Sequence, residues 1–296
     1  MKLRRRHTWL IASILAVSTG AVSAQANSRD LENGGKLLLT NGAASVDGSS
    51  GGGLTTWAVI AGKATEEGIG VSAHATLLEL PDYRLQSHGF AIGLFDRVEL
   101  SYARHNFDTK AVGTALGLGR GFKLNQDIYG AKLRLAGNLV YGAPALPQIS
   151  VGANYRKNLD APVVTLVGAS RSEDIDFYIS ASKLVLSHSV LLNGTARLTR
   201  ANQFGLLGFG GDKQVDRSLE FEASVGYQFS RNFLVGGEYR TKPDNLSFAA
   251  EGGAMDLFAA WAINDNFTLT AAYADLGNIA IQDKQRGAFL SLQAAF

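Results

Sequence analysis

The sequence predicts an all-β protein, built as a transmembrane antiparallel up-and-down β-barrel of 12–14 strands. Apolar residues alternate with polar or small ones over segments of about ten residues, the length of a tilted membrane-spanning strand. Aromatic residues fall near the ends of these segments, and short connections alternate with long ones. After residue 26, no window approaches the ~18 consecutive apolar residues that a spanning helix needs.

The composition limits the class of protein. The chain has 296 residues, of which 46% are apolar and 18% charged, and it contains 34 glycines and no cysteine. This apolar content excludes a disordered tail protein. The lack of cysteine excludes a disulfide scaffold, a Cys-ligated zinc site, an iron–sulfur cluster and a cysteine nucleophile.

Residues 1–26 have the pattern of a signal peptide. Lys2 and three arginines precede the apolar stretch 9–17, and small residues precede Ala24 and Ala26. The stretch is too short for a retained membrane anchor, so we expect cleavage after Ala26 and a place outside the cytoplasm. The signal holds four of the 28 basic residues, which leaves 24 against 26 acidic ones, a net charge of −2. This charge gives no reason to expect nucleic acid as a partner.

The barrel is expected over residues 54–296. Period-two alternation predicts thirteen strands, near 54–62, 70–79, 88–95, 97–106, 125–140, 148–156, 174–185, 189–199, 218–229, 232–241, 253–263, 266–275 and 287–296. An even count requires either a fourteenth strand at 35–46 or one fewer. The Gly-rich segment 27–53 is therefore a first strand or a plug, and its run 48–53 also fits a surface loop. Lys183 falls on an apolar position, which predicts a bulge or a kink there.

Three short connections have the same design, a three-residue hairpin loop. Phe229 is expected opposite Phe233, a register that places Glu222 opposite Arg240 on the inner face. Leu94 is likewise expected opposite Val98. The long connections are 80–87, 107–124, 157–173, 200–217, 242–252 and 276–286, and the short side is expected to face the periplasm.

The last strand carries one apolar face that ends the chain: Ala288, Leu290, Leu292, Ala294 and Phe296. It resembles the C-terminal strand of Gram-negative outer-membrane barrels, although an aromatic residue is more usual at position 294. The resemblance implies outer-membrane lipid as surroundings and recognition of Phe296 by the barrel-assembly machinery. Residues 34–61 are similar to the opening of an uncharacterised proteobacterial outer-membrane family, which has no assigned activity.

Charged residues on the inward parity are the candidate lumen-lining residues. Their two signs balance, which fits either a polar pore with facing charges or a salt-bridged, water-poor interior. The hairpin 256–274 turns an almost uncharged wall inward, which leaves space for a solute or a plug. The candidates are Lys132, Arg134, Arg156, Asp174, Asp176, Arg197, Glu220, Glu222, Glu238 and Arg240.

Catalytic chemistry has little support in the sequence. His88, His105, Asp82 and Asp108 could form a His–Asp site at the outer rim, but their spacing fits no known arrangement. No motif has metal-ligand spacing, so we expect no catalytic residue, no metal and no cofactor. The favoured function is a passive channel for a small polar or amphiphilic solute. The alternatives are a closed structural or surface-interaction barrel and, with less support, an outer-membrane enzyme.

Overall fold

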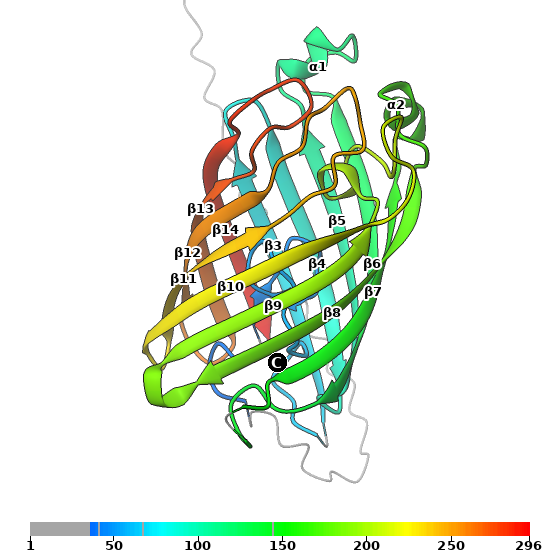
Figure 1. Ribbon diagram of the computed structural model, residues 1–296. Coiled ribbons are helices and arrows are strands. Elements are labelled where there is room, and N and C mark those ends of the chain that lie inside the picture. Colours follow the sequence, from blue (N-terminus) through cyan, green and yellow to red (C-terminus); the bar gives the residue numbers. More distant parts are fainter. Residues whose placement is uncertain (1–35, 41, 67, 144) are drawn as a thin grey trace, which may run out of the picture. The chain divides into compact units, whose positions relative to one another are not determined.

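The computed structural model describes residues 36–40, 42–66, 68–143 and 145–296, so the expected signal peptide lies outside the described residues. Within them, twelve antiparallel strands close into a barrel (Figure 1). Strand β14 pairs with β3, so the sheet has no free edge. The barrel strands are β3 (Ile69–Glu79), β4 (Arg84–Leu94), β5 (Val98–Asp108), β6 (Lys123–Ala136), β7 (Gln148–Asn158), β8 (Glu173–Val185), β9 (Val190–Thr199), β10 (Ser218–Ser230), β11 (Phe233–Arg240), β12 (Ala254–Ala262), β13 (Phe267–Asp275) and β14 (Arg286–Ala295).

The barrel has twelve strands, the lower of the two expected numbers. The strand expected at 54–62 is wrong, and the described part of 35–46 contributes only the two-residue strand β1 (Ala43–Ala44). Strand β1 pairs with β2 (Ser50–Gly51) in a small separate sheet. The run 48–53, for which a surface loop was an alternative, is buried. These residues fold inside the barrel, where apolar and small side chains are as favourable as on a lipid-facing strand.

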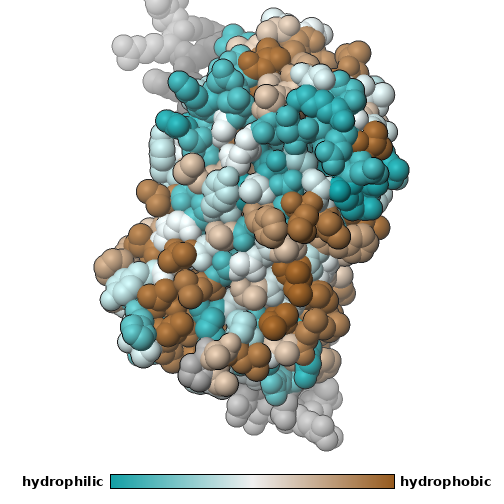
Figure 2. Space-filling model, in the orientation of Figure 1, coloured by the Kyte–Doolittle hydropathy of each residue, from teal (hydrophilic) through white to brown (hydrophobic). Residues whose placement is uncertain are grey.

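The outer surface of the barrel is apolar, as the alternation predicts. On β10, Phe221 and Val225 are exposed, whereas Glu222 and Ser224 between them are buried. Figure 2 shows brown, hydrophobic side chains gathered over the lower half of this face and teal, hydrophilic ones above them. A closed barrel with such a belt satisfies its backbone internally and presents an apolar surface to lipid.

A row of aromatic rings marks the outer edge of this belt. Phe90, Tyr102, Tyr129 and Tyr155 lie side by side on β4 to β7, with ring centroids 5.8, 5.2 and 6.1 Å apart. The next outward position on each strand, one step toward the long loops, is polar: His88, Arg104, Asp127 and Lys157. Aromatic residues bordered by polar ones are typical of a membrane interface.

The connections differ between the two ends of the barrel. The end that carries Phe296 has short turns, such as η1 (Leu186–His188), and one longer connection at 137–147. The other end carries the connections 80–83, 109–122 with α1 (Val112–Ala115), 159–172 with α2 (Ala161–Leu166), 200–217 with η2 (Asn202–Gly205), 241–253 and 276–285. Short turns face the periplasm in such barrels, so we call these the inner and the outer end.

Most of the expected registers are confirmed. Leu94 pairs with Val98, and Glu222 pairs with Arg240. The pairing of Phe229 with Phe233 is wrong, because the register shifts after Gln228 and Ser230 pairs with Phe233 instead.

The bulge expected at Lys183 is also wrong, since β8 pairs with β7 and β9 without a register shift. The Lys183 ammonium group lies under the 137–147 connection and donates to the carbonyls of Asn138 (3.3 Å) and Leu146 (3.2 Å). Four such carbonyls lie within hydrogen-bond distance, so a long side chain carries its charge to a polar site without bending the strand.

Candidate functional site

The lumen is filled by the chain's own N-terminal part. The residues described between Gly42 and Gly62, which we call the plug, are almost all buried although they form hardly any regular structure. Lys36, just before the plug, donates from Nζ to the carbonyls of Ile60 (2.7 Å) and Gly62 (3.3 Å). The plug therefore enters and leaves the barrel at the inner end.

Three inward glutamates hold the plug by its backbone. Glu238 accepts hydrogen bonds from the amides of Gly53 (2.7 Å) and Leu54 (2.6 Å), and Glu222 accepts one from the amide of Thr56 (2.7 Å). Hydrogen bonds to ionised acceptors are the stronger kind. The plug is thus fixed mainly through backbone amides, which every residue type except proline carries.

Glu99 and Lys132 form a similar clamp on neighbouring strands. Glu99 accepts from the amides of Ser50 (3.1 Å) and Ala61 (2.8 Å). Lys132 pairs with Glu99 at 3.1 Å and donates to the carbonyls of Ser50 (3.0 Å) and Val59 (2.9 Å). This pair holds two points of the plug that are distant in sequence, which fixes its folded path.

One plug side chain carries a charge into the wall network. Asp47 forms a two-point ion pair with Arg156, at 3.0 and 2.7 Å, and a further contact with Arg240 at 3.1 Å. Arg156 also bonds Asp176 at 2.7 Å, and Arg240 lies 3.4 Å from Glu222. A buried charge is tolerated only when it is paired in this way.

The uncharged wall receives the apolar part of the plug. Trp57 and Val59 pack with Phe258 and Ala260 of β12, in the hairpin whose inward wall the sequence marks as almost uncharged. The Trp57 indole N–H lies 3.0 Å from the hydroxyls of both Thr55 and Ser224. The apolar ring therefore faces the uncharged wall, and its polar edge faces hydroxyls.

Glycine allows the plug backbone to approach Glu238 closely. A Cβ atom on Gly52 would lie 1.7 Å from the Glu238 Oε1 atom, which is far inside any allowed contact. The Gly-rich run 48–53 therefore lets the backbone approach a carboxylate closely, as glycine does at other tight sites.

The structure places the predicted lumen residues in three groups. Seven of them contact the plug or one another inside the barrel: Lys132, Arg156, Asp176, Arg197, Glu222, Glu238 and Arg240. Arg134 lies at the inner end, where it pairs with Asp96. Asp174 lies at the outer end and pairs with Arg200 and Arg217. Glu220 is half-buried near the outer end of β10.

Sequence reasoning missed three important residues. Glu99 and Asp256 stand on the inward parity, so the strand pattern could have found them. Asp47 lies outside any strand, and no pattern marks it.

The structure does not assemble the alternative His–Asp site. His105 is buried and bonds the carbonyl of Val46 in the plug (2.6 Å), whereas His88 lies in β4 on the outward face. Asp82 bonds Gln285, and Asp108 bonds the amide of Lys110. Among the described residues, no group of three His, Asp or Glu residues could hold a metal ion, and no helix is long and apolar enough to cross a membrane.

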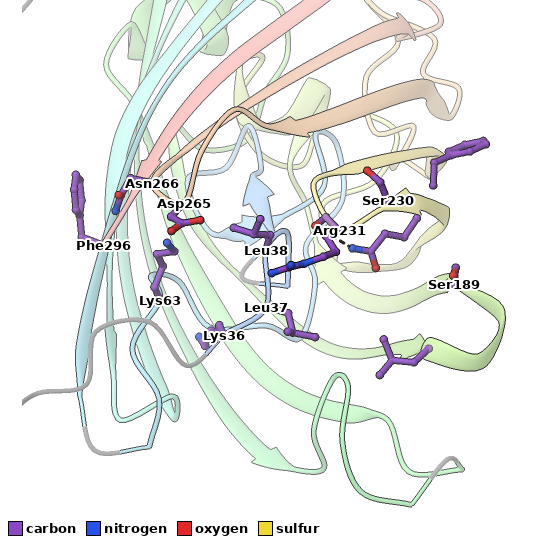
Figure 3. A pocket seen from close by; sticks show the side chains of 13 residues that line it. Lys36, Leu37, Leu38, Lys63, Ser189, Ser230, Arg231, Asp265, Asn266 and Phe296 are labelled. Carbon is purple, nitrogen blue, oxygen red and sulfur yellow. Dashed lines mark hydrogen bonds between the residues drawn. The ribbon is translucent and has the colours of Figure 1, made fainter.

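The two ends of the lumen differ in polarity. At the inner end, a polar vestibule of about 790 Å³ includes Lys36, Lys63, Arg231 and Asp265 (Figure 3). At the outer end, an apolar cluster joins the plug residues Val46 and Leu54 to side chains of the outer connections. Both the plug and this apolar cluster therefore lie across the lumen.

Solved structures are similar to this chain at low identity. A structure of the KdgM porin has a TM-score of 0.51 at 10% identity, covering 76% of this chain and 99% of that one. A structure of the NanC porin has a TM-score of 0.47 at 8% identity, covering 76% and 98%. Outer membrane phospholipase A from Escherichia coli has a TM-score of 0.43 at 10% identity, covering 76% and 92%.

The protein is an outer-membrane β-barrel in architecture, and the sequence assigns it to a family. No curated protein matches the chain. The family described as "Protein of unknown function (DUF3034)" matches residues 40–293, which include the whole plug and nearly all of the barrel. The chain therefore belongs to the DUF3034 family.

Proposed function

We propose that the protein is a passive channel for a small polar or amphiphilic solute and that the plug closes it. The supporting observation is that a separate stretch of chain fills the lumen, held to the wall mainly by hydrogen bonds to its backbone. A barrel of twelve strands is wide enough for an aqueous lumen once such a filling leaves.

The path of the plug fits removal toward the periplasm. The plug enters and leaves at the inner end, where Lys36 contacts the carbonyls of Ile60 and Gly62. Withdrawal therefore requires breaking hydrogen bonds but no threading of a chain end through the barrel. The polar vestibule at that end offers solvated space next to the plug.

The wall that remains without the plug carries charges of both signs. Lys132, Arg156 and Arg240 face the lumen together with Glu222 and Glu238. Under this proposal, the predicted lumen residues serve in two states: they bind the plug when the channel is closed and contact the solute when it is open. No catalytic step is part of the proposed function.

Single-channel conductance in a planar bilayer tests the proposal. We compare the signal-free protein with a variant in which a short Gly-Ser linker replaces residues 42–62, both shown to be folded by heat-modifiable gel mobility. The full protein is expected to be silent most of the time, and the deletion variant to give discrete, reproducible steps.

Silence from the folded deletion variant would contradict the channel and favour the closed structural barrel. If the deletion prevents folding, Glu222→Gln combined with Glu238→Gln weakens the same clamps in the full chain. More frequent openings are then expected, and unchanged silence from the folded variant would count against the channel.

Two features of export and assembly belong to the same proposal. We infer that residues 1–26 are removed and that the barrel-assembly machinery recognises Phe296. The supporting observation is that the Phe296 backbone exchanges hydrogen bonds with Val71 at the β14–β3 closure (2.8 and 2.9 Å), while its side chain remains exposed.

A further inference from the structure

The outer end contains an apolar cavity that the plug clamps do not explain. Its volume is about 170 Å³, and several outer connections meet around it. Val163 and Leu166 come from α2, Leu116 from the chain after α1, and Leu207 and Phe248 from two longer loops. Among the described residues, none of the side chains that line it is charged.

This lining restricts the chemistry of an occupant. A cavity of about 150 Å³ lined by Leu, Ile and Phe stays dry and takes up benzene. A charged molecule would lose its hydration here without gaining a partner. The volume and the lining therefore fit a small uncharged molecule about the size of a benzene ring.

A second cavity lies between this site and the plug. It is only about 20 Å³ in volume and includes Val46 and Leu54 of the plug in its lining. Phe107 and Ile279 line both cavities and so form the partition between them. This partition and the smaller cavity thus separate the outer cavity from the outer tip of the plug.

Tyr83 holds this partition in place. Its ring stacks on Phe107 with centroids 5.0 Å apart, and its hydroxyl donates to the carbonyl of Ile279 at 3.0 Å. Both contacts come from one side chain in the short 80–83 connection. A rotation of Tyr83 would therefore loosen both sides of the partition together.

The mouth of the cavity is apolar as well. Leu166 is 78% exposed at the end of α2, although it lies in the outer connections beyond the lipid-facing strands. Figure 2 also shows brown side chains at the top of the molecule, around the position of α1 in Figure 1. Apolar side chains exposed next to a cavity are typical of a ligand-binding site.

We propose that this cavity is the outer binding site for a small uncharged apolar molecule, about the size of a benzene ring. This binding does not rest on the proposed channel, because the cavity takes an apolar molecule and the channel a polar or amphiphilic solute. The site selects its ligand by size and by lack of charge.

Methyl NMR of the full protein in lipid nanodiscs tests the binding, with toluene as the probe. Signals of Val163, Leu166 and Leu207 report on the cavity, and Leu257 reports on the lipid-facing surface, where it is 73% exposed. Toluene is expected to shift the cavity signals saturably and the Leu257 signal only in proportion to its partitioning into lipid. Benzoate, which has the same ring with a charge, is expected to leave the cavity signals in place.

Two variants make the test specific. Val163→Phe fills the cavity, and Leu166→Glu places a charge at its exposed mouth, where folding does not depend on the side chain. Each is expected to raise the toluene concentration that half-saturates the shift at least tenfold. Leu159→Glu, in the same connection but outside the lining, is the matched control and is expected to leave it unchanged.

Cavity signals that follow the Leu257 signal without saturation would overturn the proposal. Equal shifts with benzoate, or shifts that depend on protein concentration instead of toluene, would overturn it too, the latter by indicating a second copy of the chain as the occupant. Saturable toluene binding, together with no conductance from the deletion variant, would support the binding site and refute the channel. Conductance of the deletion variant without toluene binding would keep the channel and refute the site.

Discussion

At the scale of single residues, the contact between Gly52 and Glu238 determines how tightly the plug is held. We predict that Gly52→Ala displaces the Glu238 carboxylate, because the new Cβ would lie 1.7 Å from Oε1. The variant is expected to open several-fold more often than the parent protein in single-channel recordings, while remaining heat-modifiable on gels.

Gly252 offers a matched control for this substitution. It lies in an outer connection, and a Cβ atom there meets no atom within 4 Å. Gly252→Ala is therefore expected to match the parent protein. Equal opening rates in Gly52→Ala, Gly252→Ala and the parent would contradict the role given to Glu238.

Asp256 is a buried carboxyl whose burial no hydrogen bond or ion pair among the described residues offsets. It is buried directly opposite Glu238, and among the described residues neither of its carboxyl oxygens has a hydrogen-bond partner. Like charges directly opposite one another on neighbouring strands destabilise a sheet. We predict that Asp256→Asn stabilises the barrel by about 1 kcal/mol, measured as a higher urea midpoint of the gel-mobility transition.

Glu238→Gln is expected to destabilise the barrel, in contrast to Asp256→Asn. This substitution weakens the acceptor for the amides of Gly53 and Leu54 and is expected to lower the midpoint. If Asp256→Asn also lowered the midpoint, the Asp256 carboxyl would be stabilising the barrel through a hydrogen-bond partner.

At the scale of elements, the contact between the loops 200–217 and 241–253 is expected to depend on pH. Burial raises the pKa of Glu251 to about 8, although the Lys242 ammonium opposes this shift. The Glu251 carboxyl lies 2.9 and 3.0 Å from the backbone amide of Gln203. Because burial of the carboxyl raises its folded-state pKa, the packing of the two loops around it is most stable below the ordinary value near 4.5 and weakens as pH rises through about 8, although the hydrogen bond from Gln203 itself favours the ionised form.

A spin label at Asp216→Cys measures this effect, since the chain has no other cysteine. We predict that the label becomes more mobile between pH 6 and pH 9. Glu251→Gln, which cannot ionise, is expected to remove most of this change. A pH response of equal size in both proteins would show that another group controls the loops.

Strand patterns and registers are the part of the fold that the sequence predicts well. Side chains on a strand alternate by necessity, so burial alternates along β10 and the pairing of Glu222 with Arg240 follows from the parity. The bulge expected at Lys183 shows the limit of this reasoning. A long side chain can carry its charge to distant carbonyls, and parity alone does not reveal them.

At the scale of the whole molecule, the plug could not be derived from the sequence, although it stood among the alternatives. The carboxylates of the wall bind its backbone amides, and such bonds leave no pattern of side chains. The candidate lumen residues were found because inward charges stand out on strands. Their common role as clamps appears only when the lumen and its filling are seen together.

Thr55 of the plug lies against Ser224 of the wall inside the barrel, and a crosslink between the two positions tests this placement. The two hydroxyls are 2.6 Å apart, close enough for a disulfide after small shifts in a Thr55→Cys, Ser224→Cys variant. Mild oxidation of this variant in intact outer membranes is measured by the altered gel mobility of the crosslinked chain. Thr55→Cys combined with Leu257→Cys, whose second site faces lipid, is the control.

We predict nearly complete crosslinking of the Thr55–Ser224 pair and none of the control pair. Folded protein in which Thr55→Cys and Ser224→Cys stay unlinked, or in which both pairs react equally, would show that the N-terminal segment does not occupy the lumen.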